Sequence, residues 1–175
     1  MRRRALLAAV NALSLSRIAL AAAYPLAGDA SWRVSLVALA GASDFLDGWI
    51  ARRTHLTTRW GAILDPVTDR LFVLTAITTH LVEGSLGVAQ YYALLVRDLA
   101  TAVGFLVARA VPWLRGVELR ARWAGKIVTV LQLATLLALS LAPRLVVPLV
   151  AAVVATSVWA IADYTRALWR ERPPA

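Results

Sequence analysis

Long apolar stretches alternate with short polar segments along the whole chain. Six stretches are each close to the ~20 residues that an α-helix needs to cross a bilayer. In chain order they are Leu6–Leu26, Val34–Ala51, Gly61–Val82, Ala89–Val111, Trp123–Leu141 and Leu145–Thr165. Glycine, proline and many of the charged side chains fall in the connections between them. The pattern predicts an all-α integral membrane protein, one domain over residues 1–175 with six transmembrane helices.

Arginine is distributed unequally between the two sides that six spans would create. Only Arg33 and Arg144 fall on one side. The other side carries Arg2, Arg3, Arg4, Arg52, Arg53, Arg59, Arg109, Arg115, Arg120, Arg122, Arg166, Arg170 and Arg172. Because cytoplasmic loops of membrane proteins are enriched in Lys and Arg, we expect both termini in the cytoplasm, as in a bacterial-type inner membrane.

Composition and charge agree with this class. Of the 175 residues, 60% are hydrophobic and the mean hydropathy is +0.68, which exceeds the apolar share of a soluble domain. The net charge of +9 comes from arginines scattered between apolar runs, with no basic stripe of the kind that binds nucleic acid. We therefore expect the charge to contact anionic lipid headgroups, with no nucleic-acid partner. The absence of cysteine excludes thiolate metal sites.

Four aspartates stand out within the second and third apolar stretches. Asp44 and Asp47 are three residues apart, and Asp65 and Asp69 are four apart, so each pair lies on one helix face. A carboxylate inside hydrocarbon costs roughly 2.5 to 3.5 kcal/mol or more, so the group needs a shared positive partner. Hard divalent cations take carboxylate oxygens as ligands. We expect one or, more readily, two Mg²⁺ or Mn²⁺ ions here, between two antiparallel helices with opposed acidic faces.

Small residues surround these aspartates. Gly48, Ala51 and Gly61 would let a nucleotide or pyrophosphate approach the backbone closely. Arg52, four residues after Gly48, could bind a phosphate oxygen. The alternative explanation for the small residues is tight packing between membrane helices.

The complete pattern is D-x2-D-G-x2-A-R-x8-G-x3-D-x3-D. Its fixed positions are Asp44, Asp47, Gly48, Ala51, Arg52, Gly61, Asp65 and Asp69. This pattern resembles the signature of the CDP-alcohol phosphatidyltransferases. The segment from Asn11 to Arg17 is similar to the N-x-L-(S/T)-x2-R segment of that family, and Lys126 falls where members carry a basic residue in the fifth span.

The resemblance implies a six-helix membrane enzyme, usually a homodimer, with a cytoplasm-facing polar cavity. Members transfer a phosphatidyl group from CDP-diacylglycerol to an alcohol and release CMP. By this resemblance, Asp44, Asp47 and Asp65 would be metal ligands. Asp69 would complete the metal site or act as the general base. The residues implied for the CDP site are Gly48, Ala51, Arg52, Gly61 and Asn11.

The acceptor alcohol is less clearly indicated. The candidates for binding a phosphate on the acceptor are Arg97, Arg122, Lys126 and Arg17. The segment from Trp123 to Thr129 resembles the synthases that use glycerol 3-phosphate, although Val128 replaces their second lysine. The Arg97-Asp98 pair and the stretch from Lys126 to Gln132 also resemble cardiolipin synthases, which use phosphatidylglycerol. We favour glycerol 3-phosphate and keep phosphatidylglycerol as the alternative; inositol phosphate and serine stay open.

A function of a different class is an ion or solute transporter with aspartates along its path. That class predicts acids spread across the depth of the bilayer. Here four gather near one face, with only Asp98 and Asp163 in other spans. The clustering favours an enzyme.

Overall fold

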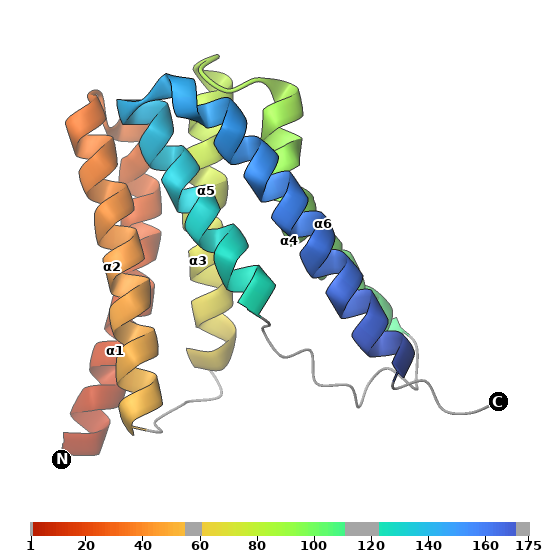
Figure 1. Ribbon diagram of the computed structural model, residues 1–175. Helices are drawn as coiled ribbons and strands as arrows, with labels where there is room; N and C mark the ends of the chain where they lie inside the picture. The colour runs from red at the N-terminus through yellow and green to blue at the C-terminus, as the bar shows by residue number, and fades with distance from the viewer. Residues whose placement is uncertain (1, 55–60, 111–122, 171–175) are drawn as a thin grey trace. The chain divides into compact units, whose positions relative to one another are not determined.

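The structure is a computed structural model that describes residues 2–54, 61–110 and 123–170. These ranges contain six α-helices and no strand (Figure 1). The helices are α1 (Arg2–Ala23), α2 (Ala30–Thr54), α3 (Gly61–Val82), α4 (Val88–Ala110), α5 (Trp123–Leu141) and α6 (Val146–Arg170), with 3-10 turns η1 (Tyr24–Leu26) and η3 (Pro143–Leu145). The all-α class and the six predicted helices are confirmed.

Membrane crossing by each helix is a separate matter. Among the described residues, one stretch, Pro143–Asp163, is long and apolar enough by length and composition to cross a bilayer. Two shorter apolar helical stretches are Leu15–Leu26 and Gly125–Leu141. The charges that interrupt the other helices, Asp44 and Asp47 in α2 for example, lower their hydropathy. The six membrane crossings therefore stay a prediction.

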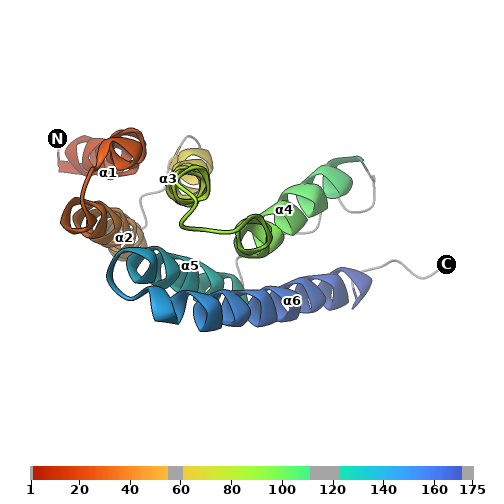
Figure 2. The same ribbon diagram turned by 90° about the horizontal axis from the view of Figure 1, so that it is seen from above.

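The chain divides into two compact units. The first contains residues up to Leu86 together with Leu136–Pro143, and the second contains Gly87–Thr135 and the residues from Arg144 onward. In the first unit, α1 packs along both α2 and α3, whereas α2 and α3 contact each other only sparsely (Figure 2). The helix α1 lies alongside both. The acidic faces of α2 and α3 turn toward the same α1 side chain, Arg17, which pairs with Asp47 and with Asp69.

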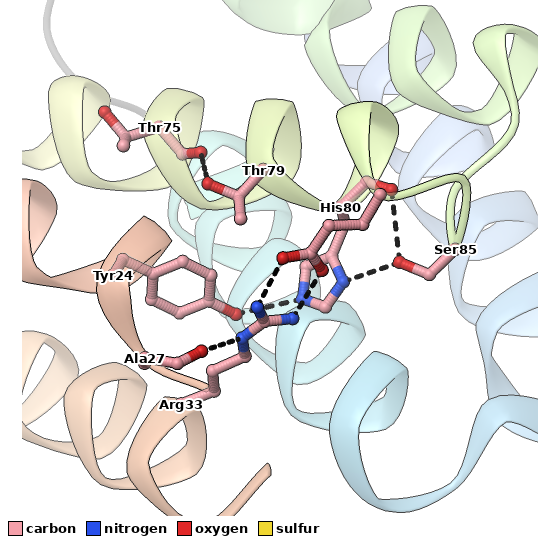
Figure 3. Close-up of polar contacts among 8 residues, drawn as sticks. Tyr24, Ala27, Arg33, Thr75, Thr79, His80 and Ser85 are labelled. Atoms are coloured by element: carbon pink, nitrogen blue, oxygen red, sulfur yellow. Dashed lines mark hydrogen bonds and ion pairs between the residues drawn. The ribbon is translucent and has the colours of Figure 1, made fainter. Parts of the chain in front are cut away.

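A polar network closes the end of the first unit where α1 meets the start of α2 and the end of α3 (Figure 3). The ring of His80 is buried, with its Nε2 3.0 Å from the Tyr24 hydroxyl and its Nδ1 2.8 Å from the Ser85 hydroxyl. Arg33 donates from Nε to the Ala27 carbonyl at 3.0 Å. Because buried polar groups are costly unless they are hydrogen-bonded, these partners fix how the three segments meet.

The helix α3 ends in a turn that requires glycine. Gly84 has φ of 75° and is the one described glycine in the left-handed region. The amides of Ser85 and Leu86 both donate to the His80 carbonyl, at 3.0 and 3.1 Å. This pattern resembles a glycine C-cap, in which a left-handed residue lets the following amides reach back to the last helical carbonyls.

Candidate active site

The guanidinium of Arg17 forms the centre of the aspartate cluster. Arg17 lies on α1 and is 1% exposed. Its Nη2 donates a hydrogen bond to Asp47 Oδ2, and its Nη1 forms an ion pair with Asp69 Oδ1. Asp44 Oδ1 lies 3.6 Å from the same Nη1. Three helices therefore build the cluster: α1 supplies the cation, α2 supplies Asp44 and Asp47, and α3 supplies Asp69.

The three carboxylates differ in their exposure to solvent. The side chain of Asp47 is 7% exposed, that of Asp69 is 32% exposed and that of Asp44 is 50% exposed. Exposure thus increases from the deepest group, Asp47, to Asp44 at the rim. Such a gradient leaves carboxylate oxygens accessible from one side while the arginine occupies the inner side.

The donor set suits a hard divalent cation. Within the described residues, no group of three His, Cys, Asp or Glu side chains is arranged to hold a metal ion; Asp44, Asp47 and Asp69 instead converge on Arg17. Mg²⁺ and Mn²⁺ prefer carboxylate oxygens as ligands. Here two helices present such oxygens around one positive group. By this chemistry the residues fit a divalent metal, with Arg17 as a second cation at the same oxygens. Asp65 lies in the first turns of α3, and its side chain is outside the description.

The residues predicted for the CDP site are described only in part. Gly48 lies on α2 directly after Asp47 and is half-buried. The positions of Ala51 and Arg52 in α2, Gly61 in α3 and Asn11 in α1 are described for the backbone alone. The role of these five residues in binding CDP therefore stays a prediction.

Two of the predicted acceptor residues lie in the second unit. Arg97 on α4 donates from Nη1 to Asp98 Oδ1 at 3.1 Å, and its Nε is buried without a hydrogen-bond partner in the part of the chain that is described. Lys126 on α5 is exposed. Arg122 lies outside the described residues. The fourth candidate, Arg17, belongs to the aspartate cluster in the first unit.

One buried polar side chain near Arg97 was not among the predicted site residues. Gln132 on α5 is 2% exposed and donates from Nε2 to the Leu94 carbonyl at 2.8 Å and to Asp98 Oδ2 at 2.9 Å. It therefore holds the carboxylate that pairs with Arg97. The sequence signal that could have revealed this contact is a side-chain amide within an apolar helix, because such a group must find a partner in the helices around it.

Comparison with known proteins identifies the family of this chain. The family model of the CDP-alcohol phosphatidyltransferases matches residues 6–162, nearly the whole chain. The chain belongs to this family. Members are membrane-associated and generally use divalent metals. Membership in the CDP-alcohol phosphatidyltransferase family favours the enzyme class over the transporter alternative.

Two groups of relatives are similar to this chain. Proteins described as "Putative cardiolipin synthase" from Mycobacterium bovis and Mycobacterium tuberculosis are 36% identical over 129 residues, which is 68% of this chain and 57% of theirs. A "CDP-diacylglycerol--glycerol-3-phosphate 3-phosphatidyltransferase" from Yersinia enterocolitica is 30% identical over 149 residues, 75% of each chain. This chain thus spans a little over half the length of the mycobacterial relatives.

Proposed function

We propose that this protein transfers a phosphatidyl group from CDP-diacylglycerol to an alcohol and releases CMP. The observation that carries the proposal is the convergence of Asp44, Asp47 and Asp69 from two helices on one positive group. They are positions of the sequence pattern that resembles the signature of the CDP-alcohol phosphatidyltransferases, the family to which the chain belongs. In this proposal the whole chain acts as one phosphatidyltransferase domain.

The aspartates would hold the metal. The proposed oxygen ligands to Mg²⁺ or Mn²⁺ are Asp44, Asp47, Asp65 and Asp69. If all four carboxylates are ligands, they would hold two ions. When bound, the metal would neutralise charge on the phosphoryl oxygens of CDP-diacylglycerol. The protein side chains then have two further tasks, which are to position the two substrates and to move one proton.

Asp69 is the proposed proton acceptor. It is more exposed than Asp47 and lies on α3, so its free oxygen is open to the acceptor hydroxyl. A carboxylate within hydrogen-bond reach of the hydroxyl can take its proton as the oxygen attacks phosphorus. The bond from phosphorus to the CMP oxygen breaks in the same exchange, and CMP leaves with that oxygen. Asp69 can combine this role with metal binding.

The nucleotide and the acceptor would be held by different residues. We propose that CDP lies against Gly48, Ala51 and Gly61, where small side chains permit close approach. Arg52 and Asn11 would supply polar contacts to it. The proposed phosphate-binding residues for the acceptor are Arg97, Arg122, Lys126 and Arg17. The buried Nε of Arg97 supports its role, because a phosphate oxygen would satisfy a donor that has no partner among the described residues.

Glycerol 3-phosphate is the favoured acceptor, and the product is then phosphatidylglycerophosphate. The alignment with the Yersinia relative covers 75% of each chain, and the description of this relative supports glycerol 3-phosphate as the acceptor. The higher identity of the mycobacterial relatives supports phosphatidylglycerol as the second candidate, which gives cardiolipin. Both acceptors carry a phosphate that an arginine can bind in bidentate geometry.

The same proposal includes the membrane arrangement. Six helices would cross the inner membrane with both termini and a polar cavity at the cytoplasmic side, since the arginines concentrate there. The protein would act as a homodimer, as the resemblance to the family implies. The bilayer itself is a partner, because CDP-diacylglycerol reaches the enzyme from within it.

One experiment tests the reaction and the acceptor together. The purified chain is incubated in detergent with CDP-diacylglycerol, Mg²⁺ or Mn²⁺, and one acceptor at a time: glycerol 3-phosphate, phosphatidylglycerol, inositol phosphate or serine. We expect CMP release that requires the metal and is fastest with glycerol 3-phosphate, with phosphatidylglycerophosphate as the lipid product. No metal-dependent CMP release with any acceptor would reject the proposal.

A further inference from the structure

A buried arginine occupies the oxygens that the proposed function assigns to a metal. The Arg17 guanidinium contacts Asp47 and Asp69 directly, and Asp44 lies 3.6 Å away. At 1% exposed, Arg17 has less access to solvent than any of its three carboxylate partners. The arginine is therefore the innermost group of the cluster.

The burial of Arg17 has an electrostatic reason. An arginine is always protonated, so it cannot enter an apolar helix bundle unless carboxylates compensate its charge. The reverse also holds, because Asp47 is nearly as buried and needs a positive partner. The three described carboxylates carry a charge of −3 and Arg17 carries +1, which leaves −2 among these four groups. One divalent cation would balance this remainder.

We propose that Arg17 is the built-in counter-ion of the metal site. Without metal, its guanidinium holds the aspartates of α2 and α3 together. Divalent ions compete with it for the oxygens of Asp47 and Asp69, and the arginine gives up these oxygens when the ions bind. This inference rests on the proposed function, because it takes the aspartates to be the metal ligands.

The competition follows from the geometry. A carboxylate oxygen that accepts a charge-assisted hydrogen bond from a guanidinium cannot present the same lone pair to a metal ion. The free energy of metal binding is therefore reduced by the free energy of the arginine contacts that the metal displaces. The released guanidinium keeps five donors in a planar fork, which suits a phosphate oxygen pair. Metal loading would thus convert Arg17 from a ligand of aspartate into a ligand for a substrate phosphate.

The test measures Mn²⁺ binding without turnover. Free Mn²⁺ is followed by electron paramagnetic resonance as it is titrated into the purified full chain in detergent, with no lipid substrate. In Arg17→Met the competitor is absent and the stem volume is similar. We expect its Kd for Mn²⁺ to fall by about tenfold or more relative to the unmodified protein, because the metal relieves carboxylates that are left uncompensated.

Two further variants keep the result interpretable. Arg17→Lys retains a cation, so it should fold even if Arg17→Met does not, but a single ammonium replaces the planar fork. The Kd of Arg17→Lys for Mn²⁺ should lie between that of the unmodified protein and that of Arg17→Met. Arg33→Met is the matched control, because Arg33 also forms a carboxylate pair, with Glu83, but at the opposite end of α2 from Asp47. Its Kd for Mn²⁺ should equal that of the unmodified protein.

The outcomes separate this inference from the proposed function. Mn²⁺ binding that is lost in Asp47→Asn and is equal or weaker in Arg17→Met and Arg17→Lys would overturn the counter-ion role and leave the metal site intact. No Mn²⁺ binding by the unmodified protein or any variant would overturn the metal site and the counter-ion role together. Mn²⁺ binding that is tightest in Arg17→Met, weaker in Arg17→Lys and weakest in the unmodified protein supports both.

Discussion

Arg33 donates two parallel hydrogen bonds to Glu83, from Nη1 to Oε2 at 2.6 Å and from Nη2 to Oε1 at 2.5 Å. The pair connects the start of α2 to the residue that follows α3. Bidentate pairing fixes the relative angle of two groups as well as their distance. It therefore fixes the end of the first unit that is remote from the aspartates.

This pair predicts a dependence of stability on pH. The hydrogen bonds from Arg33 hold the pKa of Glu83 below its ordinary value of 4.5. A carboxyl whose pKa is lower in the folded state stabilises the fold above its unfolded pKa, and this contribution is lost as the pH falls through the folded value. Thermal unfolding in detergent should show the unmodified protein more stable than Glu83→Gln at pH 7. The difference should shrink below about pH 4. A difference that is constant with pH would contradict the prediction.

The turn after α3 predicts a difference between two glycines. In Gly84→Ala the side chain must adopt the left-handed region at φ 75°, which costs roughly 1–2 kcal/mol. Gly28→Ala is the control, because a methyl group there meets no atom within 4 Å and the backbone is not left-handed. Denaturant unfolding should show a loss of stability for Gly84→Ala alone. Equal effects of the two substitutions would argue against strain at residue 84.

Asp69→Asn tests the proposed base. The amide cannot accept the proton of the acceptor hydroxyl, so CMP release should fall at least about a hundredfold. Binding of CDP-diacylglycerol should be largely retained, because the other aspartates are intact. Asp163→Asn on α6 is the control and should leave both properties unchanged. Near-normal CMP release from Asp69→Asn would exclude the base role.

Arg97→Met tests the acceptor site. Loss of one charge-assisted contact to a phosphate corresponds to about tenfold or more in affinity. The KM for glycerol 3-phosphate should rise by that factor while the KM for CDP-diacylglycerol changes little. Gln132→Met should have a smaller effect in the same direction, since Gln132 acts on Arg97 only through Asp98, the partner of Arg97. Arg166→Met, an exposed arginine on α6, should have no effect. A rise in both KM values would indicate general damage instead.

The helices could be predicted from the sequence, because long apolar runs separated by short polar segments form few structures other than helices. The bounds of α3 and α5 agree with the prediction at both ends. The spacing of the aspartates also predicted a gathered cluster. It could not predict that Arg17 joins them, since the pattern along one helix says nothing about which neighbour packs against it. The partner of Gln132 was hidden for the same reason.

The order of the chain adds a consequence for its synthesis. The ribosome makes α1 first, so Arg17 is already present when Asp44 and Asp47 of α2 emerge. In the proposed membrane arrangement, the acidic helix α2 would enter the lipid with its charge partly compensated by Arg17, before α3 or any metal is available. A chain in which α1 followed α3 would have to insert its carboxylates without this counter-charge, and we expect such a permuted protein to be degraded or left outside the membrane.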